Sequence, residues 1–518
     1  MKRLTSYLSG EWVDGEGEGS ALYNPTSGDV VASCSTQGLD LASALKYARD
    51  VGGASLSALS FAERGALLSE MSQAIHARRE ELIALGQLNA GNTRGDAKFD
   101  IDGATHTLMH YARLADTLGE GNILFDGEPE PVARGGRLLG QHVLVPRGGV
   151  AIHINAFNFP AWGLAEKAAC AILAGMPVLS KPATSTALMT HAIMESLADV
   201  MPAGVLSLLC GRAGDLLDHV EWRDVIAFTG SADTGALIRN HPQVLASGAA
   251  VNVEADSLNA MVLDPEAEEA TYDAFIRHAH LEITQKSGQK CTAVRRIFVP
   301  EDRLEEVLED LTERFGRTTV GDPTLDGVTM GPLSTPSQRE AALEGLETLM
   351  SQAKVVYGGP RDAVRAADGV DVSGGAFVTP TLLCAEGPLS ADSPIHNLEV
   401  FGPVATIVPF DGSAQQAIEQ VRHGQGCLVS AIYADQSAFL RDTVIGLAAW
   451  NGRLVVIDEQ VAEKALAPGL VTPQLLHGGP GRAGGGEELG GLRGLKLYQQ
   501  RCAIQGNGPK LARLIRGG

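Results

Sequence analysis

The sequence predicts an α/β protein built on a mostly parallel sheet, with a second α/β unit after it. Short apolar runs rich in β-branched residues alternate with alanine-rich stretches of helical length from about residue 143, which is typical of βαβ units. A second series of the same kind begins near Ala293 and continues to about Ala449. The chain has 518 residues, more than the ~250 that one hydrophobic core usually supports. We therefore expect at least two domains.

The first series places its loops where ligands usually bind. Apolar runs at residues 149–154, 177–180, 205–210 and 225–229 are separated by helical stretches such as residues 159–173. Ligands of open parallel sheets bind at the loops beyond the carboxyl ends of the strands. Before this series, residues 61–89 carry apolar side chains at near-helical spacing, which predicts one long helix packed on the first domain.

Composition excludes several classes of function. The chain has 41 Lys and Arg against 62 Asp and Glu, a formal charge of −21, which argues against nucleic acid or an anionic membrane as partner. Its start is polar and no run of ~20 apolar residues occurs, so we expect no membrane span and a cytoplasmic location. The seven cysteines have no C-x-x-C or Cys/His spacing, so neither disulfides nor a metal site is expected.

One cysteine has the surroundings of a nucleophile. Cys291 lies in the segment 285–292, a short glycine-containing loop between a helical stretch and a strand. A free thiol titrates near ~8.5, so a thiolate at neutral pH needs a neighbouring base or backbone N–H groups. The alternative is a buried core cysteine, the commoner situation for this residue.

Two other strand ends carry matching chemistry. Glu254 ends an apolar run and could activate water, although a solvated strand end or a helix cap is the ordinary alternative. Asn158, in the segment 155–160, could donate to an oxyanion, although an Asx-turn before Pro160 is the simpler interpretation.

Two glycine segments compete as phosphate sites. Residues 479–484 match G-x-G-x-x-G, but we expect neither a strand directly before them nor a helix after them, so we reject them. Residues 228–235 are the better candidate, because Thr229 and Gly230 lie between a strand and a helix that Ser231 can cap.

These segments together resemble the aldehyde dehydrogenase superfamily over nearly the whole chain. The matches, in order, are Asn158-Phe159-Pro160, Lys181-Pro182-Ala183, Phe228-Thr229-Gly230-Ser231, the segment at Glu254, Gly288 to Ala293, and Glu399-Val400-Phe401-Gly402-Pro403. The resemblance implies a Rossmann-like cofactor domain, an α/β catalytic domain and a small oligomerisation extension, divided at residues 1–255, 256–460 and 461–518. It also implies a homodimer or a dimer of dimers.

The resemblance implies roles for the residues as well. Cys291 would be the nucleophile and Glu254 the general base, while Asn158 and the Cys291 backbone N–H would form the oxyanion hole. Glu399, in the segment that contains Phe401, would lie near the nicotinamide ribose.

Cofactor choice depends on Lys181 and Thr184. Lys181 would meet the adenosine ribose. NAD-preferring members of the superfamily often carry a glutamate where this chain has Thr184, and without that charge a 2′-phosphate can pair with Lys181. We expect NADP, with NAD possible.

Within the superfamily the chain resembles the semialdehyde dehydrogenases of CoA-linked benzoate and phenylacetate degradation. This resemblance lies in residues 154–160, in 253–259 and in the glycine-rich block 477–493. It implies 3,4-dehydroadipyl-CoA semialdehyde or 3-oxo-5,6-dehydrosuberyl-CoA semialdehyde as substrate, with any hydratase on a separate protein. The block is either a set of tight turns or a source of Arg482 and Arg493 for CoA phosphates.

Two alternatives remain. One is an aliphatic aldehyde dehydrogenase of broad specificity. The other is a catalytically silent structural oligomer, which would have no chemical need for Cys291, Glu254 and Asn158 together.

Overall fold

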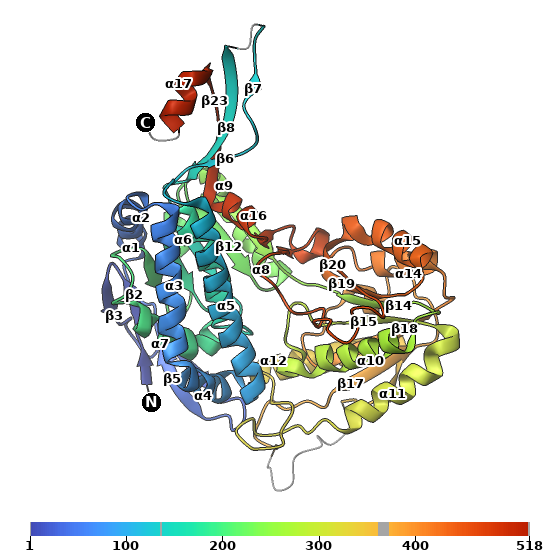
Figure 1. Cartoon of the computed structure of the whole chain (residues 1–518). Helices are drawn as coiled ribbons and strands as arrows, with labels where there is room; N and C mark the ends of the chain where they lie inside the picture. Colours follow the sequence, from blue (N-terminus) through green and yellow to red (C-terminus); the bar gives the residue numbers. More distant parts are fainter. Residues whose placement is uncertain (1, 135–136, 361–371, 516–518) are drawn as a thin grey trace.

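The computed structural model describes residues 2–134, 137–360 and 372–515. Two seven-stranded sheets lie side by side, and an antiparallel arm projects from the first of them (Figure 1). The α/β prediction with two units is confirmed. Among the described residues, no helix combines the length and the apolar character that crossing a membrane requires.

The first sheet has a parallel centre and an antiparallel edge. Its order is β13-β12-β9-β10-β11-β2-β3, and the registers Thr229↔Glu254 and Phe228↔Ile154 place the carboxyl ends of neighbouring strands together. Its strands are β2 (Ser6–Leu8), β3 (Glu11–Val13), β9 (Ala151–Ile154), β10 (Val178–Lys181), β11 (Leu206–Leu208), β12 (Val225–Thr229) and β13 (Ala250–Glu254).

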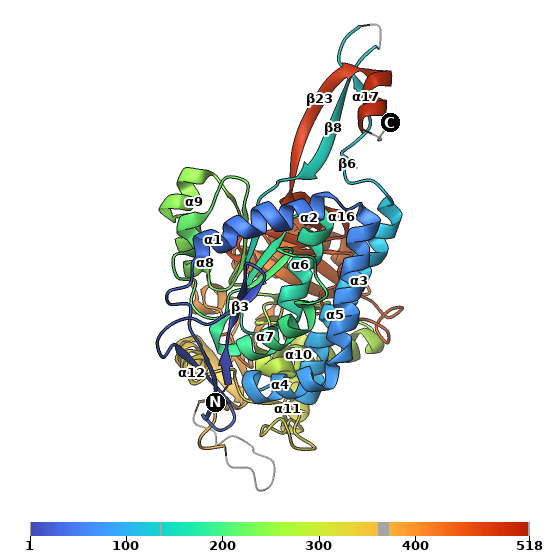
Figure 2. The ribbon, with the colours of Figure 1, turned by 90° about the vertical axis from the view of Figure 1, so that its left-hand side faces the viewer.

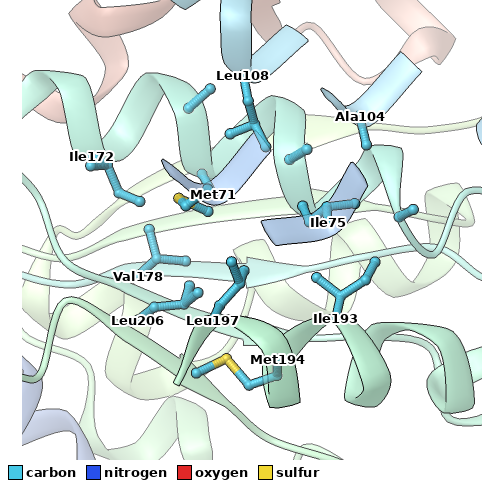
Figure 3. Close-up of a cluster of buried hydrophobic side chains, with 14 of the residues drawn as sticks. Met71, Ile75, Ala104, Leu108, Ile172, Val178, Ile193, Met194, Leu197 and Leu206 are labelled. Carbon is cyan, nitrogen blue, oxygen red and sulfur yellow. The ribbon is translucent and has the colours of Figure 1, made fainter. Parts of the chain in front are cut away.

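Helices cover both faces of this sheet. On one side α3 and α5 run together over α6, and the buried side chains of these helices, such as Met71, Leu108 and Ile172, meet Val178 and Leu206 of the sheet (Figure 3). The helices of this half are α1 (Leu41–Tyr47), α2 (Gly53–Ser57), α3 (Phe61–Ala77), α4 (Arg79–Ala90), α5 (Arg94–Leu118), α6 (Trp162–Ala174), α7 (Ala187–Leu197), α8 (Ala232–Arg239) and α9 (Pro242–Ser247). A small sheet of β1 (Lys2–Leu4), β5 (Val30–Cys34) and β4 (Ser20–Tyr23) lies beside them.

The prediction of one helix over residues 61–89 is wrong. The helix begins as expected at a capping box of Ser60 and Glu63, but it breaks at Arg78, where φ is −102° and ψ is 16°. The Arg78 guanidinium donates to the Ala192 carbonyl at 2.5 Å and pairs with Glu81. Tertiary contacts with α7 thus accompany the break in a helical pattern that local spacing would have continued.

The second sheet begins shortly after the first ends. Its order is β16-β17-β18-β15-β14-β19-β20, and all its pairs except β16 with β17 are parallel. Its strands are β14 (Ala260–Leu263), β15 (Arg296–Pro300), β16 (Ala353–Tyr357), β17 (Thr381–Ala385), β18 (Val404–Phe410), β19 (Cys427–Tyr433) and β20 (Asn451–Ile457). Its helices are α10 (Glu269–Thr284), α11 (Leu304–Gly316), α12 (Pro336–Leu349), α13 (Pro394–Asn397), α14 (Ala414–Arg422) and α15 (Ser437–Leu447).

The arm joins two distant parts of the chain. Strand β8 (Leu138–Pro146) pairs antiparallel with β23 (Gln499–Asn507), flanked by β6 (Leu124–Phe125), β7 (Glu130–Pro131) and α17 (Gly508–Ile515). Figure 2 shows that it stands away from the body of the molecule. The arm therefore takes β6, β7 and β8 from the first 150 residues as well as the C-terminal segment, and the domain limits taken from the resemblance stay a prediction.

Candidate active site

A cleft between the two sheets collects the predicted chemical residues. A cavity of about 630 Å³ and a narrow one of about 40 Å³ share Asn158, Glu254 and Cys291 as lining residues. Asn158 follows β9, Glu254 ends β13, and Cys291 lies between α10 and β15. The structure thus brings together three residues that the sequence spreads over more than a hundred positions.

The loop before Cys291 is held in an unusual backbone conformation. Lys286, Ser287 and Gly288 have φ values of 53°, 54° and 68°, in the left-handed region that side chains normally avoid. Ser287 Oγ donates to the Gly331 carbonyl at 2.8 Å, and Lys286 Nζ lies 4.6 Å from the centre of the Phe159 ring. These contacts fix the loop, as strained backbone at a functional site requires.

Arg295 joins this loop to the segment that carries Glu399. Its guanidinium donates to the carbonyls of Gly288 at 2.9 Å and of Gly402 at 2.8 Å. A Cβ on Gly288 would lie only 2.2 Å from the Gly402 oxygen. Glycine is therefore required at 288 for conformation and for close approach.

Burial and charge set the resting state of the thiol. Burial, then the neighbouring Glu254 carboxylate and its hydrogen bond to the thiol, raise the pKa of Cys291 well above its ordinary value. These effects favour the neutral thiol over the thiolate.

The sequence interpretation missed His477, which lies beside Glu254. The distance from His477 Nε2 to Glu254 Oε2 is 3.2 Å, and both side chains are about 95% buried or more. Behind them Lys167 Nζ lies 3.0 Å from Glu166 and 3.1 Å from Glu488. His477 and Glu488 face each other on β21 (Leu476–Gly478) and β22 (Glu487–Leu489), inside the glycine-rich block.

The larger cavity is lined by every residue that the sequence predicted to bind the cofactor. Its lining includes Lys181, Thr184, Thr229, Gly230, Ser231, Glu399 and Phe401. Glu399 accepts from the Ser257 N–H at 3.2 Å and lies 3.5 Å from Arg295 Nε. Burial, opposed by Arg295, raises the pKa of Glu399 to about 7.

The turn expected to bind phosphate is present, but an acidic side chain already accepts a hydrogen bond from it. Ser231 caps α8 by accepting from the Thr234 N–H, as predicted. The Ala232 N–H, however, donates to Asp256 at 3.1 Å. A ligand phosphate at this helix end would therefore have to displace that carboxylate.

The same cavity is lined by Lys181 and Thr184, the pair expected at the adenosine ribose. Lys181 ends β10, and its Nζ donates to the Pro182 carbonyl at 3.1 Å. Burial lowers its pKa from the ordinary lysine value, and nearby thiols oppose this shift. Thr184, the first residue of a 3₁₀ turn, lines the same wall.

The glycine-rich block packs against both sheets. A strand, β21, does precede residues 479–484, contrary to our expectation, but only the short turn Gly481–Ala483 follows it. A Cβ on Gly484 would lie 2.2 Å from the Val253 carbonyl, so close backbone packing accounts for that glycine.

Arg482 lines the cofactor cavity and donates to the Asn397 carbonyl at 2.7 Å. Arg493 is exposed in the short helix α16 (Leu492–Leu495).

The narrow cavity adjoins a wider opening. Phe99, Trp162 and Val471 line both the narrow cavity and a neighbouring one of about 590 Å³. That outer cavity, here called the mouth, adds apolar and polar side chains, among them Leu466, Leu470, Pro473, Lys98 and His106.

This fold and this cleft define a family. The chain belongs to the aldehyde dehydrogenase family, whose model matches residues 12–458. It is an NAD(P)-dependent aldehyde dehydrogenase with the aldehyde dehydrogenase fold. The NAD⁺ complex of aldehyde dehydrogenase from Bacillus cereus matches with a TM-score of 0.84 at 24% identity, covering 98% of this chain and 97% of that one.

Curated relatives resolve the class further. The chain is 43% identical to the 3,4-dehydroadipyl-CoA semialdehyde dehydrogenase of Aromatoleum evansii, over 92% of this chain and 93% of that protein. It is 29% identical to the hydroxyisobutyraldehyde dehydrogenase of Mycolicibacterium austroafricanum, over 95% and 92%. Protein MaoC of Klebsiella aerogenes matches 35% of this chain and 52% of its own length at 39% identity. The predicted superfamily and enzyme class are confirmed, whereas the residue roles and the expectation of no metal stay predictions.

Proposed function

We propose that this enzyme oxidises a CoA-linked unsaturated semialdehyde to its acid in the degradation of aromatic compounds, with NADP as the preferred cofactor. The 43% identity to the 3,4-dehydroadipyl-CoA semialdehyde dehydrogenase along nearly the full length of both chains carries this proposal. A 3-oxo-5,6-dehydrosuberyl-CoA semialdehyde is the second substrate of this class that we would test.

Cys291 forms the covalent bond to the substrate. Its thiolate attacks the aldehyde carbon, and the side-chain amide of Asn158 together with the Cys291 backbone N–H stabilises the resulting oxyanion. A nicotinamide held in the cavity that Lys181 and Glu399 line would supply the hydride acceptor, and oxidation of the Cys291 adduct would leave an acyl thioester on Cys291. Cys291 and Asn158 both line the cavity that connects the aldehyde site to the cofactor site, which supports this geometry.

Glu254 completes the turnover by hydrolysis. Its carboxylate takes a proton from a water molecule, whose oxygen attacks the thioester carbon and releases the acid. A free CoA acceptor is not needed for this step. The CoA of the substrate therefore serves as a handle for binding rather than as an acyl acceptor.

The mouth supports a long substrate with a distal anionic part. Its apolar side chains continue from the aldehyde cavity, which suits the pantetheine arm. Lys98 provides positive charge at this opening of a chain whose net charge is −21. Asp102, which also lines the mouth, is paired with Arg79 at 2.7 Å.

Lys181 and Thr184 support the preference for NADP. An ammonium group and a hydroxyl on one wall of the cofactor cavity can both bind a 2′-phosphate, and no carboxylate side chain stands at position 184 to repel it. Glu399 and Phe401 line the same cavity, and the nicotinamide ribose would lie beside them.

The arm supports a dimer. Phe125, Val132 and Leu138 are exposed apolar side chains on it or beside it. Exposed apolar surface on a projecting sheet is typical of a surface that pairs with a second copy.

The first experiment compares substrates and cofactors. Formation of reduced nicotinamide is measured with a CoA-linked unsaturated semialdehyde and with a simple aliphatic aldehyde, each with NADP and NAD, with Cys291→Ala as control. A strong preference for the CoA substrate with NADP supports the proposal. Equal turnover of the simple aldehyde favours an enzyme of broad specificity, and activity retained in Cys291→Ala would refute the covalent mechanism.

A further inference from the structure

The general base has a titratable partner whose purpose the fold does not explain. His477 comes from the glycine-rich block, lies 3.2 Å from Glu254, and lines the same narrow cavity as Cys291. Burying a histidine and a carboxylate together is costly unless they interact. The pair also opens toward the reacting atoms instead of closing a packing gap inside a core.

We propose that His477 is a positioning residue that shares a proton with Glu254, so that the pair, rather than the carboxylate alone, accepts the proton of the hydrolytic water. The inference rests on the proposed hydrolysis of a Cys291 thioester. In that step the water oxygen bonds to the acyl carbon, the carbon–sulfur bond breaks, and Cys291 leaves as the thiolate. One water proton passes to Glu254 and is held between it and His477, while the other stays on the product acid.

The electrostatics of the pair explain why a partner is useful. Burial raises the pKa of Glu254, but the His477 ring, its hydrogen bond and Lys167 outweigh that effect and lower the pKa below the ordinary value. A carboxylate so firmly ionised is a weak base, and general bases work best when their pKa is near the working pH. Burial lowers the pKa of His477, but Glu254 and the neighbouring carboxylates outweigh it and raise the pKa above 6.5.

The surroundings favour the charged ring. Facing the pair are Glu166 and Lys167 from α6, Glu488 from β22, and the Cys291 thiol. Lys167 is shared between Glu166 and Glu488. The cluster thus contains three carboxyl groups against one ammonium group, and a protonated His477 offsets part of that excess.

The raised pKa of His477 sets the direction in which the deacylation rate changes with pH. Below the raised pKa of His477 the pair already holds its proton, and Glu254 is a poor acceptor. Above that pKa the pair has lost the proton and can take one from water. Deacylation should therefore become faster as the pH rises through an ionisation above 6.5.

The test separates acylation from deacylation. Enzyme with NADP bound is mixed with an activated ester such as p-nitrophenyl acetate, and the burst and the steady rate are recorded between about pH 5 and 9, a range that spans the ordinary pKa of histidine. His477→Gln keeps an N–H donor for Glu254 but cannot take a proton. We expect this variant to keep the burst. Its deacylation rate should no longer rise with pH above 6.5, and the plateau of that rate should fall about tenfold or more.

The matched control is His278→Gln. His278 is also buried and hydrogen-bonded, to the Tyr433 hydroxyl at 2.8 Å and to the Ala465 backbone, but it does not line the site. Its pH profile should equal that of the unmodified enzyme. His477→Asn, a smaller amide, repeats the test if glutamine lowers the melting temperature.

Each outcome decides the inference. If the deacylation rate of His477→Gln still rises with pH as in the unmodified enzyme, even at a uniformly lower level, His477 has only a packing role and the inference is overturned. Ester turnover retained in Cys291→Ala would instead refute the acyl-enzyme itself, and this inference with it.

Discussion

Gly288→Ala is the substitution whose effect follows most directly from the structure. A Cβ there would lie 2.2 Å from the oxygen and 2.4 Å from the carbon of Gly402, and 2.7 Å from Cα of Pro403. All three are backbone atoms, so no side chain can rotate away. The residue also has φ of +68°, which costs a non-glycine residue about 1–2 kcal/mol.

The two costs add because they arise from different atoms. Overpacking at a well-packed contact costs about 1–3 kcal/mol, so the total destabilisation is about 2–5 kcal/mol. Relief requires the Cys291 loop and the Glu399 segment to separate. A displacement of ~1 Å in a reacting geometry lowers the rate about 10²-fold.

The assay combines thermal melting with formation of reduced nicotinamide. Gly53→Ala is the control, because Gly53 starts α2 and has no neighbouring atom within 4 Å of a new Cβ. We expect the control to match the unmodified enzyme in both measurements. A Gly288→Ala enzyme that melts normally and turns over normally would refute the reasoning.

Three further substitutions test separate parts of the molecule. Glu254→Gln should keep the acylation burst on Cys291 and slow steady turnover about 10²- to 10⁴-fold, as burst kinetics would show. Lys181→Met should weaken NADP binding about 10- to 150-fold, the value of a charged hydrogen bond of about 1.5–3 kcal/mol, and weaken NAD binding less, measured by titration of each cofactor. Arg49→Leu removes the partner of the fully buried Asp224, which its guanidinium contacts at 2.5 Å, and should cost about 3–5 kcal/mol in denaturant unfolding.

Each of these has an opposing result. Loss of the burst in Glu254→Gln would show that the carboxylate acts before the thioester forms. If Lys181→Met weakened the binding of NADP and NAD equally, Lys181 would not contact the 2′-phosphate. The exposed pair of Lys354 and Glu386 is the control for Arg49, because Lys354→Ala should change stability by less than about 0.5 kcal/mol.

The convergence of three catalytic candidates was predictable from one-dimensional features. Asn158 and Glu254 each follow an apolar run, and neighbouring parallel strands end at the same edge of a sheet. Cys291 lies in a loop that leads into a strand of the second sheet. Strand ends place Asn158 and Glu254 at one edge, whereas the resemblance of the motifs to the family was needed to add Cys291.

His477 escaped the same reasoning for a physical reason. The glycines around it indicated tight turns, but they do not specify which backbone the turns pack against. That neighbour is β13, where the Val253 carbonyl lies against Gly484. A contact between segments so far apart along the chain has no local signal, and a lone histidine in a turn is usually unremarkable.

The sequence by itself determined the fold class, because hydrophobic periodicity and turn chemistry are local properties. The family followed from the resemblance of its ordered motifs to those of aldehyde dehydrogenases. Tertiary structure alone decided the break at Arg78, the left-handed backbone at Lys286 and Ser287, and the ionisation of Glu254 beside His477. These depend on burial and on the distance to groups elsewhere in the chain, and both quantities exist only once the two sheets have packed together.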